Sequence, residues 1–252
     1  MPFQDTPTPT VATRLAYGAD PNQFGELRVP NTKGPFPVVM NIHGGYWRAK
    51  YGLAETGSLC AALTAKGLAT WNVEFRRVGN PGGGWPGTFE DIRRAYRFLS
   101  QIAQKNNLDL ARSLVMGHSA GGQLALCLAG HESSVKKVVS LAGIVDLQQA
   151  YELHLGDNAV VEFLGGAPKA VPEHYHEADP MQLKITATQW LIHGAPDDTV
   201  PASLSRSYAE KKKQSGEDVH YLEIATASHS DLVDPHSIAW PKVESTVLHL
   251  LT

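Results

Sequence analysis

Cysteine is scarce in this chain, and neither sign of charge is in large excess. Only Cys60 and Cys127 occur among 252 residues, and both lie in apolar, helix-like stretches. We therefore expect two reduced core residues of a cytoplasmic protein, with a disulfide between them as the alternative. A chain of this length buries enough surface to fold without covalent links, so the shortage of cysteine sets no limit on a globular fold.

Basic tracts and long hydrophobic runs are also lacking. Lysine and arginine number 22 against 25 acidic residues, and the one basic run, 211–213, follows a helix-like segment. This argues against nucleic acid as a partner, because phosphate binding needs clustered positive charge. The longest apolar run, 124–129, is far shorter than the ~18 residues of a membrane span, and residues 1–10 lack the order of a signal peptide. We expect a cytoplasmic protein with no membrane partner.

Short β-rich runs alternate with longer helical ones, which predicts an α/β fold in a single domain spanning residues 1–252. The expected strands are 23–29, 38–42, 69–75, 114–116, 137–141, 190–192 and 219–224. The expected helices are 55–66, 89–104, 120–130, 202–215 and 238–250. Residues 146–183 interrupt the alternation, and we expect them to form an insertion over one end of the sheet, where loops contact substrate.

The strongest motif is Gly117-His118-Ser119-Ala120-Gly121, which follows a short apolar strand and precedes a helix. Gly-x-Ser-x-Gly in that context predicts a nucleophile elbow, a turn so tight that the residues around the serine must be small. Ser119 is therefore the candidate nucleophile, and the amide of Ala120 is a candidate donor to an oxyanion. The alternative is a glycine-rich turn with an incidental serine.

A second glycine-rich motif, His43-Gly44-Gly45-Tyr46-Trp47, directly follows an apolar run. Glycine lets the backbone turn with its amides pointing inward, and in serine hydrolases this position supplies the other oxyanion donors. We assign that role to the amides of Gly45 and Tyr46, and we expect His43 to shape the loop by hydrogen bonding. The alternative is an ordinary turn whose aromatic residues pack in the core.

A nucleophilic serine also needs a general base and a carboxylate that orients the base. Asp197 and Asp198 both follow an apolar strand, and the Asp-x-x-Val-Pro spacing favours Asp197. His229 lies in the loop after the last expected strand and is the candidate base, with His193 and His236 as rivals. The order Ser, Asp, His is the order in which α/β-hydrolases carry these residues.

Taken together, these motifs resemble the esterases and lipases of the α/β-hydrolase superfamily over nearly the whole chain. His-Gly-Gly-Tyr-Trp is similar to the motif of kynurenine formamidases (arylformamidases) and to the His-Gly-Gly-Gly-Trp of bacterial feruloyl and acetylxylan esterases. Trp85-Pro86, before a helix that carries Asp91, also fits this branch. The resemblance implies a mostly parallel, twisted sheet of about eight strands with helices on both faces. One departure is Tyr46, which replaces the third glycine of the hormone-sensitive-lipase pattern, and its ring is expected to narrow the acyl side.

We therefore expect a serine carboxylesterase that acts on small esters through an acyl-enzyme on Ser119. An arylformamidase that deformylates N-formyl-kynurenine is the close alternative, and a non-catalytic protein that binds a small ligand on this fold is a distant one. Trp47, Trp85 and Tyr151 are candidate walls of the substrate site. The sequence does not indicate an oligomeric state.

No cofactor and no metal are expected. His174-Tyr175-His176 and the acidic residues near it form a weak zinc pattern, because zinc needs three or four converging ligands. The glycine-rich segment 82–87 matches Gly-x-Gly-x-x-Gly but is separated from the preceding strand, whereas a dinucleotide site needs the two joined tightly.

Overall fold

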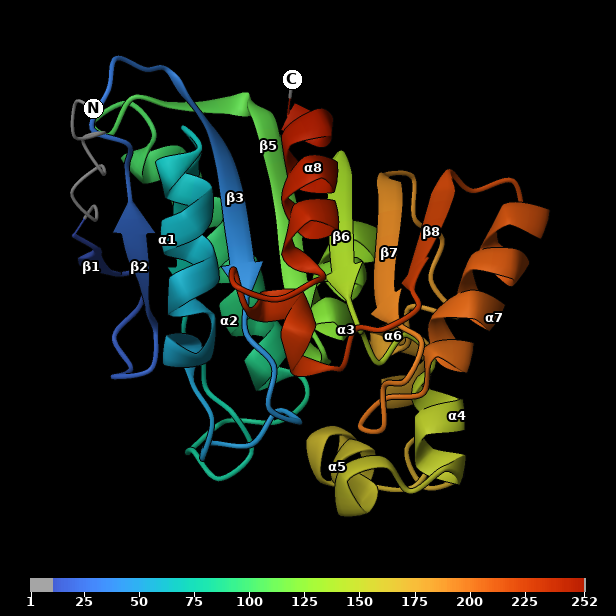
Figure 1. Cartoon of the computed structure of the whole chain (residues 1–252). Helices are drawn as coiled ribbons and strands as arrows, with labels where there is room; N and C mark the ends of the chain where they lie inside the picture. Colours follow the sequence, from blue (N-terminus) through green and yellow to red (C-terminus); the bar gives the residue numbers. More distant parts are fainter. Residues whose placement is uncertain (1–10, 252) are drawn as a thin grey trace.

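An eight-stranded β-sheet runs through the centre of the molecule (Figure 1). The computed structural model describes residues 11–251, so the prediction made for residues 1–10 falls outside it. The strands are β1 (Thr13–Ala16), β2 (Phe24–Arg28), β3 (Phe36–Ile42), β4 (Ala69–Val73), β5 (Leu108–His118), β6 (Lys137–Leu141), β7 (Thr188–Gly194) and β8 (Val219–Ile224). Their order in the sheet is β1-β2-β4-β3-β5-β6-β7-β8. β2 runs antiparallel to both its neighbours and every other pair is parallel, which confirms the predicted fold class.

Helices cover both faces of this sheet (Figure 1). They are α1 (Gly57–Ala65), α2 (Gly87–Ile102), α3 (Ala120–His131), α4 (Leu147–Glu152), α5 (Leu155–Leu164), α6 (Pro172–Ala178), α7 (Ala202–Gln214) and α8 (Trp240–Leu251), with short 3₁₀ helices η1 (Leu53–Thr56) and η2 (Ser230–Val233). Successive strand residues point to opposite faces. Val39 and Met116 accordingly pack with residues of α1 and α8, whereas Met40 and Val115 pack in the cluster that contains α2 and α3.

The strand predictions fail where a strand lacks a run of buried apolar residues. β1 was not predicted, because three of its four residues are exposed at the edge of the sheet and show no alternation. β5 begins at Leu108 instead of 114, and its first half is only partly buried and is offset from β3 by a register shift after Pro37. The fully buried strands lie near their predicted bounds because continuous apolar runs are visible in the sequence.

The three helices α4, α5 and α6 occupy the segment that interrupts the alternation. Figure 1 shows α4 and α5 beyond the end of the sheet to which the parallel strands point. In parallel α/β sheets, ligands bind at this carboxyl end of the strands. The segment therefore lies at the end of the sheet where a functional site is expected.

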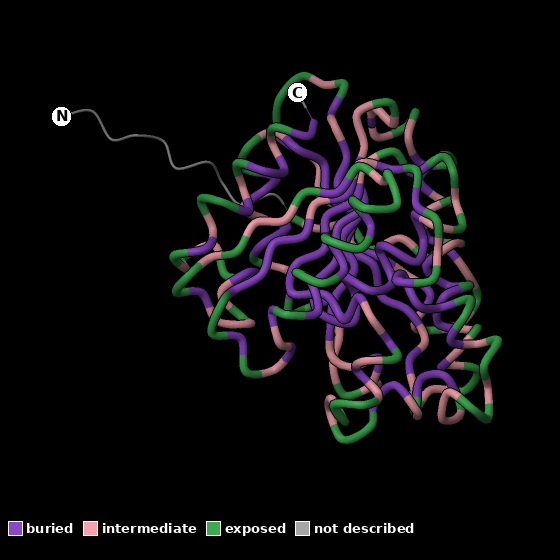
Figure 2. Tube along the Cα trace, turned by 90° about the vertical axis from the view of Figure 1, so that its right-hand side faces the viewer, coloured by how far each residue is buried: buried purple, intermediate pink, exposed green. Residues whose placement is uncertain are grey.

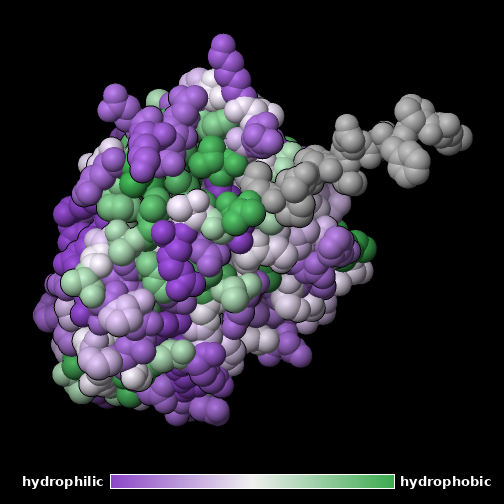
Figure 3. All heavy atoms as spheres, turned by 90° about the vertical axis from the view of Figure 1, so that its left-hand side faces the viewer, coloured by the Kyte–Doolittle hydropathy of each residue, from purple (hydrophilic) through white to green (hydrophobic). Residues whose placement is uncertain are grey.

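Burial follows the layers of the fold. Figure 2 shows the trace buried through the central strands and exposed along the outer turns. At the β1 edge, hydrophobic and hydrophilic side chains are intermingled on the surface (Figure 3). Cys60 and Cys127 are both buried and free. No helix within residues 11–251 is long and apolar enough to cross a membrane.

Candidate active site

Ser119 occupies a strained turn between β5 and α3. Its backbone dihedral angles are φ 55° and ψ −121°, and a positive φ is disfavoured for any residue that has a Cβ atom. Hydrogen bonds hold the turn on both sides, since the Ser119 amide donates to the Leu141 carbonyl over 2.8 Å and the Ser119 carbonyl accepts from the Gly122 amide over 2.9 Å. A strand, a sharp turn and a helix thus follow one another, as in a nucleophile elbow.

Two glycines permit this turn. A Cβ atom on Gly117 would lie 2.0 Å from the Gly121 carbonyl oxygen, and a Cβ atom on Gly121 would lie 2.1 Å from the Ile42 carbonyl oxygen. Both obstacles are backbone atoms, so a side chain at either position would displace the elbow. The same close packing brings the elbow against the end of β3, where the second glycine-rich motif begins.

His229 and Asp197 reach this end of the sheet from the loops that follow β8 and β7. Nδ1 of His229 lies 2.7 Å from Oδ2 of Asp197. Nδ1–H therefore donates to the carboxylate, which leaves Nε2 to exchange a proton. Asp198, the alternative acid, is exposed and accepts a hydrogen bond from the Thr199 hydroxyl. His236, one of the two rival bases, is also exposed.

Four donors surround the carboxylate of Asp197. Its Oδ1 accepts from the amides of Thr199 and Val200 over 2.9 and 2.8 Å, while Oδ2 faces His229 and, at 3.2 Å, Nε2 of His193. Burial alone would raise the pKa of Asp197, but the hydrogen bonds from His193 and His229 and the charge of His229 lower it below its ordinary value. His193 is fully buried beneath the acid, so it supports the carboxylate and does not reach the surface.

A second histidine lies against His229. Nε2 of His118 donates to the backbone carbonyl of His229 over 3.0 Å, and the two ring centroids are 4.5 Å apart. Burial, followed by the charge of His229, lowers the pKa of His118 to about 3. His118 is therefore a neutral donor at physiological pH, and its acceptor fixes the tautomer. This contact could not be predicted from the sequence, because the residue before the serine in Gly-x-Ser-x-Gly can be of any type.

The loop after β3 turns through three successive residues with positive φ. These are Gly45, Tyr46 and Trp47, with φ of 101°, 52° and 56°. The preceding Gly44 lets the loop approach the elbow, since a Cβ atom there would lie 3.0 Å from the Cβ atom of Ser119. The backbone amides assigned to oxyanion binding thus belong to a loop packed directly on the candidate nucleophile.

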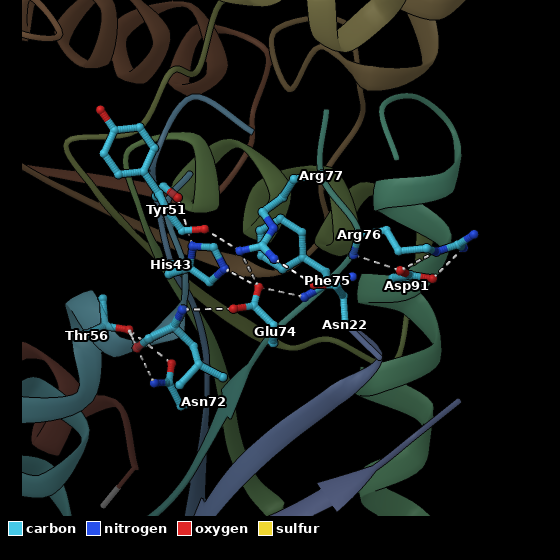
Figure 4. Close-up of polar contacts among 12 residues, drawn as sticks. Asn22, His43, Tyr51, Thr56, Asn72, Glu74, Phe75, Arg76, Arg77 and Asp91 are labelled. Atoms are coloured by element: carbon cyan, nitrogen blue, oxygen red, sulfur yellow. Dashed lines mark hydrogen bonds and ion pairs between the residues drawn. The ribbon is translucent and has the colours of Figure 1, made fainter. Parts of the chain in front are cut away.

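A buried charged network lies behind this loop (Figure 4). Glu74, which follows β4, accepts from Nε2 of His43 over 2.9 Å and from the Leu53 amide over 3.2 Å. Nδ1 of His43 lies 2.8 Å from the Gly44 carbonyl. Both ring nitrogens of His43 thus lie within hydrogen-bond distance of an oxygen atom. The expected role of His43 in shaping the loop has a physical basis in these two bonds.

Arg77 completes the network and ties it to the far side of the loop. Its guanidinium lies 2.8 Å from the Glu74 carboxylate and donates to the Tyr51 carbonyl. Burial alone would raise the pKa of Glu74, but the hydrogen bond and charge of His43 and the charge of Arg77 lower it. Glu74 therefore joins the start of the loop, at His43, directly to Leu53 and through Arg77 to Tyr51.

Ser119 and His229 line one pocket of about 140 Å³. Its lining consists of Gly45, Tyr46, Tyr51, Glu55, His118, Ser119, Thr199 and His229. The Tyr46 hydroxyl donates to the Thr199 carbonyl over 3.1 Å, so the ring closes one side of the pocket. Among residues 11–251, no partner bonds to Oγ of Ser119, and the hydroxyl is open to the pocket. Tyr51, Glu55 and Thr199 could not be predicted as pocket residues, because none of them belongs to a recognisable sequence motif.

The three predicted aromatic walls lie outside this lining. Trp47 is 1 % exposed, stacks on Phe163 with ring centroids 4.5 Å apart and donates to Gln123. Trp47 is therefore a core side chain that does not line the pocket, and its contact with substrate stays a prediction. Trp85 and Tyr151 are partly buried and do not line the pocket, so their contact with substrate stays a prediction.

No cluster of potential metal ligands accompanies the site. Within residues 11–251, three or more His, Cys, Asp or Glu side chains do not gather in an arrangement that could hold an ion. In the His174-Tyr175-His176 segment, Nδ1 of His174 instead bonds to the Leu164 carbonyl over 2.7 Å.

One family model and several curated proteins resemble this chain in sequence. A family model described as BD-FAE matches residues 27–211, well over half of the chain. The uncharacterized peptidase YtmA of Bacillus subtilis (strain 168) is 28 % identical over 81 % of this chain and 80 % of its own length. A probable isoprenylcysteine alpha-carbonyl methylesterase, ICME, of Oryza sativa subsp. japonica is 25 % identical over 89 % of this chain but 60 % of its own length.

Solved structures agree on the fold. The truncated form of a carbohydrate esterase from gut microbiota superposes with a TM-score of 0.82, at 18 % identity, over 96 % of this chain and 97 % of that one. At such low identity the likeness concerns the arrangement of strands and helices and not the substrate.

Proposed function

The chain belongs to the BD-FAE family, among the esterases of the α/β-hydrolase superfamily, and from this premise we propose that it hydrolyses small carboxylic esters through an acyl-enzyme on Ser119. The observation that carries the proposal is the 2.7 Å bond from His229 to Asp197 beside the pocket that Ser119 lines. A carboxylate, an imidazole and an open hydroxyl in this order are the parts of a serine hydrolase. We also propose that residues 1–252 form a single domain, with 146–183 as an insertion over the active-site end.

In the first half of the reaction, Ser119 Oγ attacks the ester carbonyl while Nε2 of His229 takes the hydroxyl proton. Asp197 remains ionised, holds the ring through Nδ1 and stabilises the imidazolium that forms. The amides of Gly45, Tyr46 and Ala120 bind the oxyanion. His229 then gives its proton to the leaving alcohol, and the acyl group stays on Ser119.

In the second half, water attacks the acyl-enzyme with His229 again acting as the base, and the carboxylic acid is released. The open hydroxyl of Ser119 bonds to His229 only when a substrate orients it, because catalytic hydrogen bonds are often incomplete in free enzymes. A pocket of about 140 Å³ admits a short acyl or alcohol group. This size is why the proposal specifies small esters.

Replacement of the nucleophile tests the proposal. Ser119→Ala should lower kcat for p-nitrophenyl acetate roughly 10⁶-fold, the scale of triad knock-outs in other serine hydrolases. A fluorophosphonate probe should label the wild-type protein once and leave the variant unlabelled. Ser113→Ala, which changes a serine of β5 ahead of the elbow, serves as the matched control and should keep both label and turnover. More than a tenth of wild-type turnover in Ser119→Ala would contradict the assignment.

The arylformamidase alternative has its own discriminating measurement. Turnover of p-nitrophenyl acetate, butyrate and octanoate should exceed that of N-formyl-kynurenine when all are measured with the same protein. Deformylation far above ester turnover would reverse this order and make the formamide the substrate. Fluorophosphonate that fails to label Ser119 would instead favour a non-catalytic ligand-binding protein.

A further inference from the structure

Glu55 contributes an unpaired carboxylate to the pocket that Ser119 and His229 line. It lies in η1 and is exposed, and within residues 11–251 its side chain has no hydrogen-bond or ion-pair partner. The other carboxylates near the site are compensated, since Glu74 is paired with Arg77 and Asp197 with His229. Glu55 therefore adds a carboxylate to the pocket wall that no side chain within residues 11–251 binds directly.

The remaining walls suit a positive group. Two tyrosines, Tyr46 and Tyr51, belong to the lining, and it contains no lysine or arginine. The ammonium of Lys50, which is outside the lining, already lies 4.8 Å from the centroid of the Tyr51 ring. Aromatic faces attract cations through the ring quadrupole, and a carboxylate beside them adds charge complementarity.

Resting on the proposed esterase function, we infer that the pocket prefers esters with a positive charge close to the scissile carbonyl, and that Glu55 determines this preference. The pocket is small, so the charge must lie within a few bonds of the ester to reach the carboxylate. Anionic esters of the same size should be disfavoured, because like charges repel in a site with little counter-charge.

A pair of isosteric esters tests the inference. Acetylcholine and 3,3-dimethylbutyl acetate have the same shape, but only the first carries a charge. At low ionic strength the wild-type protein should show a kcat/KM about fivefold higher for acetylcholine, the scale of one exposed cation–carboxylate or cation–π contact. In Glu55→Gln the ratio of the two kcat/KM values should fall to about 1, and 1 M salt should reduce the wild-type ratio in the same direction.

A matched control and a binding measurement complete the design. Glu210→Gln removes an exposed carboxylate from α7 and should keep the wild-type ratio. Calorimetry should show choline binding more tightly than 3,3-dimethylbutan-1-ol to wild type and equally to Glu55→Gln, whether or not the protein is active. Equal binding of the two alcohols to wild type, or a ratio unchanged by Glu55→Gln, would overturn the inference. Loss of ester turnover with the choline preference intact would overturn only the esterase proposal.

Discussion

Tyr46 combines a backbone role with a side-chain role at one position. Its positive φ belongs to the loop that packs on the elbow, while its hydroxyl donates to the Thr199 carbonyl. Burial, and then the charge of Asp197, raises the pKa of Tyr46, so the phenol remains a neutral donor. The ring also packs against Gly156 of α5, where a Cβ atom would lie 2.7 Å from it. The side chain is therefore held between Thr199 and α5 where it closes one side of the pocket.

Removal of this ring should enlarge the acyl group that the protein accepts. In Tyr46→Ala, the ratio of kcat/KM for p-nitrophenyl octanoate to that for the acetate should rise about tenfold, because one or two kcal/mol of steric exclusion is lost. The oxyanion amide is kept, so acetate should still be hydrolysed. Tyr46→Phe retains the ring without the hydroxyl and is the control. A ratio that stays at the wild-type value in Tyr46→Ala would show that another wall sets the limit.

The candidate site depends on contacts between elements that lie far apart in the sequence. Phe163 of α5 is 1 % exposed, stacks on Trp47 and meets the edge of Trp85 at 6.1 Å between centroids. Arg48, next to Trp47, forms a 2.7 Å ion pair with Glu162 of α5. The helix is thus packed and bonded to the loop that follows β3. These contacts favour a fixed wall over a mobile lid for this part of the insertion.

If α5 supports the loop, a cavity at this contact should impair both stability and catalysis. Phe163→Ala should lower the free energy of unfolding by about 3–5 kcal/mol, the cost of a large buried aromatic truncation, and should also lower kcat through the displaced loop. Phe36→Ala truncates a buried ring near the start of β3, opposite the site, and should destabilise the protein while keeping kcat. Urea unfolding and esterase kinetics on both variants measure the difference. Equal kcat values in the two variants would show that α5 does not support the loop that follows β3.

Sequence motifs and hydrophobic periodicity predicted the elements of the fold well, but they predicted the contacts between distant elements poorly. The elbow and the His-Gly-Gly loop were visible because a backbone constraint requires glycine at set spacings, as the 2.0 Å and 2.1 Å clearances at Gly117 and Gly121 show. The Asp-x-x-Val-Pro spacing indicated Asp197 because the amide of Val200 caps that carboxylate. By contrast, the exposure of Trp47 depends on its φ and on Phe163, more than 100 residues away, and neither is encoded in its local sequence.

For the molecule as a whole, two buried groups give stability opposite dependences on pH. Burial, followed by the charge of Asp146, raises the pKa of Asp179 to about 7. The folded state then holds a proton that the unfolded state releases near pH 4, so stability falls as pH rises from about 4 to 7. The pKa of His118 is instead lowered to about 3. The unfolded state takes up that proton first, so stability falls as pH drops from about 6.5 towards 3.

Asp179→Asn should therefore stabilise the protein at alkaline pH. It should also leave the pH dependence of stability that is due to His118 without the opposing contribution of Asp179. Oδ1 of Asp179 accepts from the Met181 amide over 3.0 Å, and an asparagine oxygen can keep this bond without a buried charge. The advantage of the variant in free energy of unfolding should grow by about 2–3 kcal/mol between pH 5 and pH 8, since each pKa unit corresponds to ~1.4 kcal/mol. Urea unfolding at several pH values measures it, with the exposed Asp234→Asn as the control. Protonation of His118 in the unfolded state lowers the free energy of unfolding as the pH falls, and in the variant Asp179 no longer offsets this decrease. Stability should therefore fall more steeply below pH 6 than in wild type. A constant difference between the two proteins across this range would mean that Asp179 is ionised in the folded state at every pH tested.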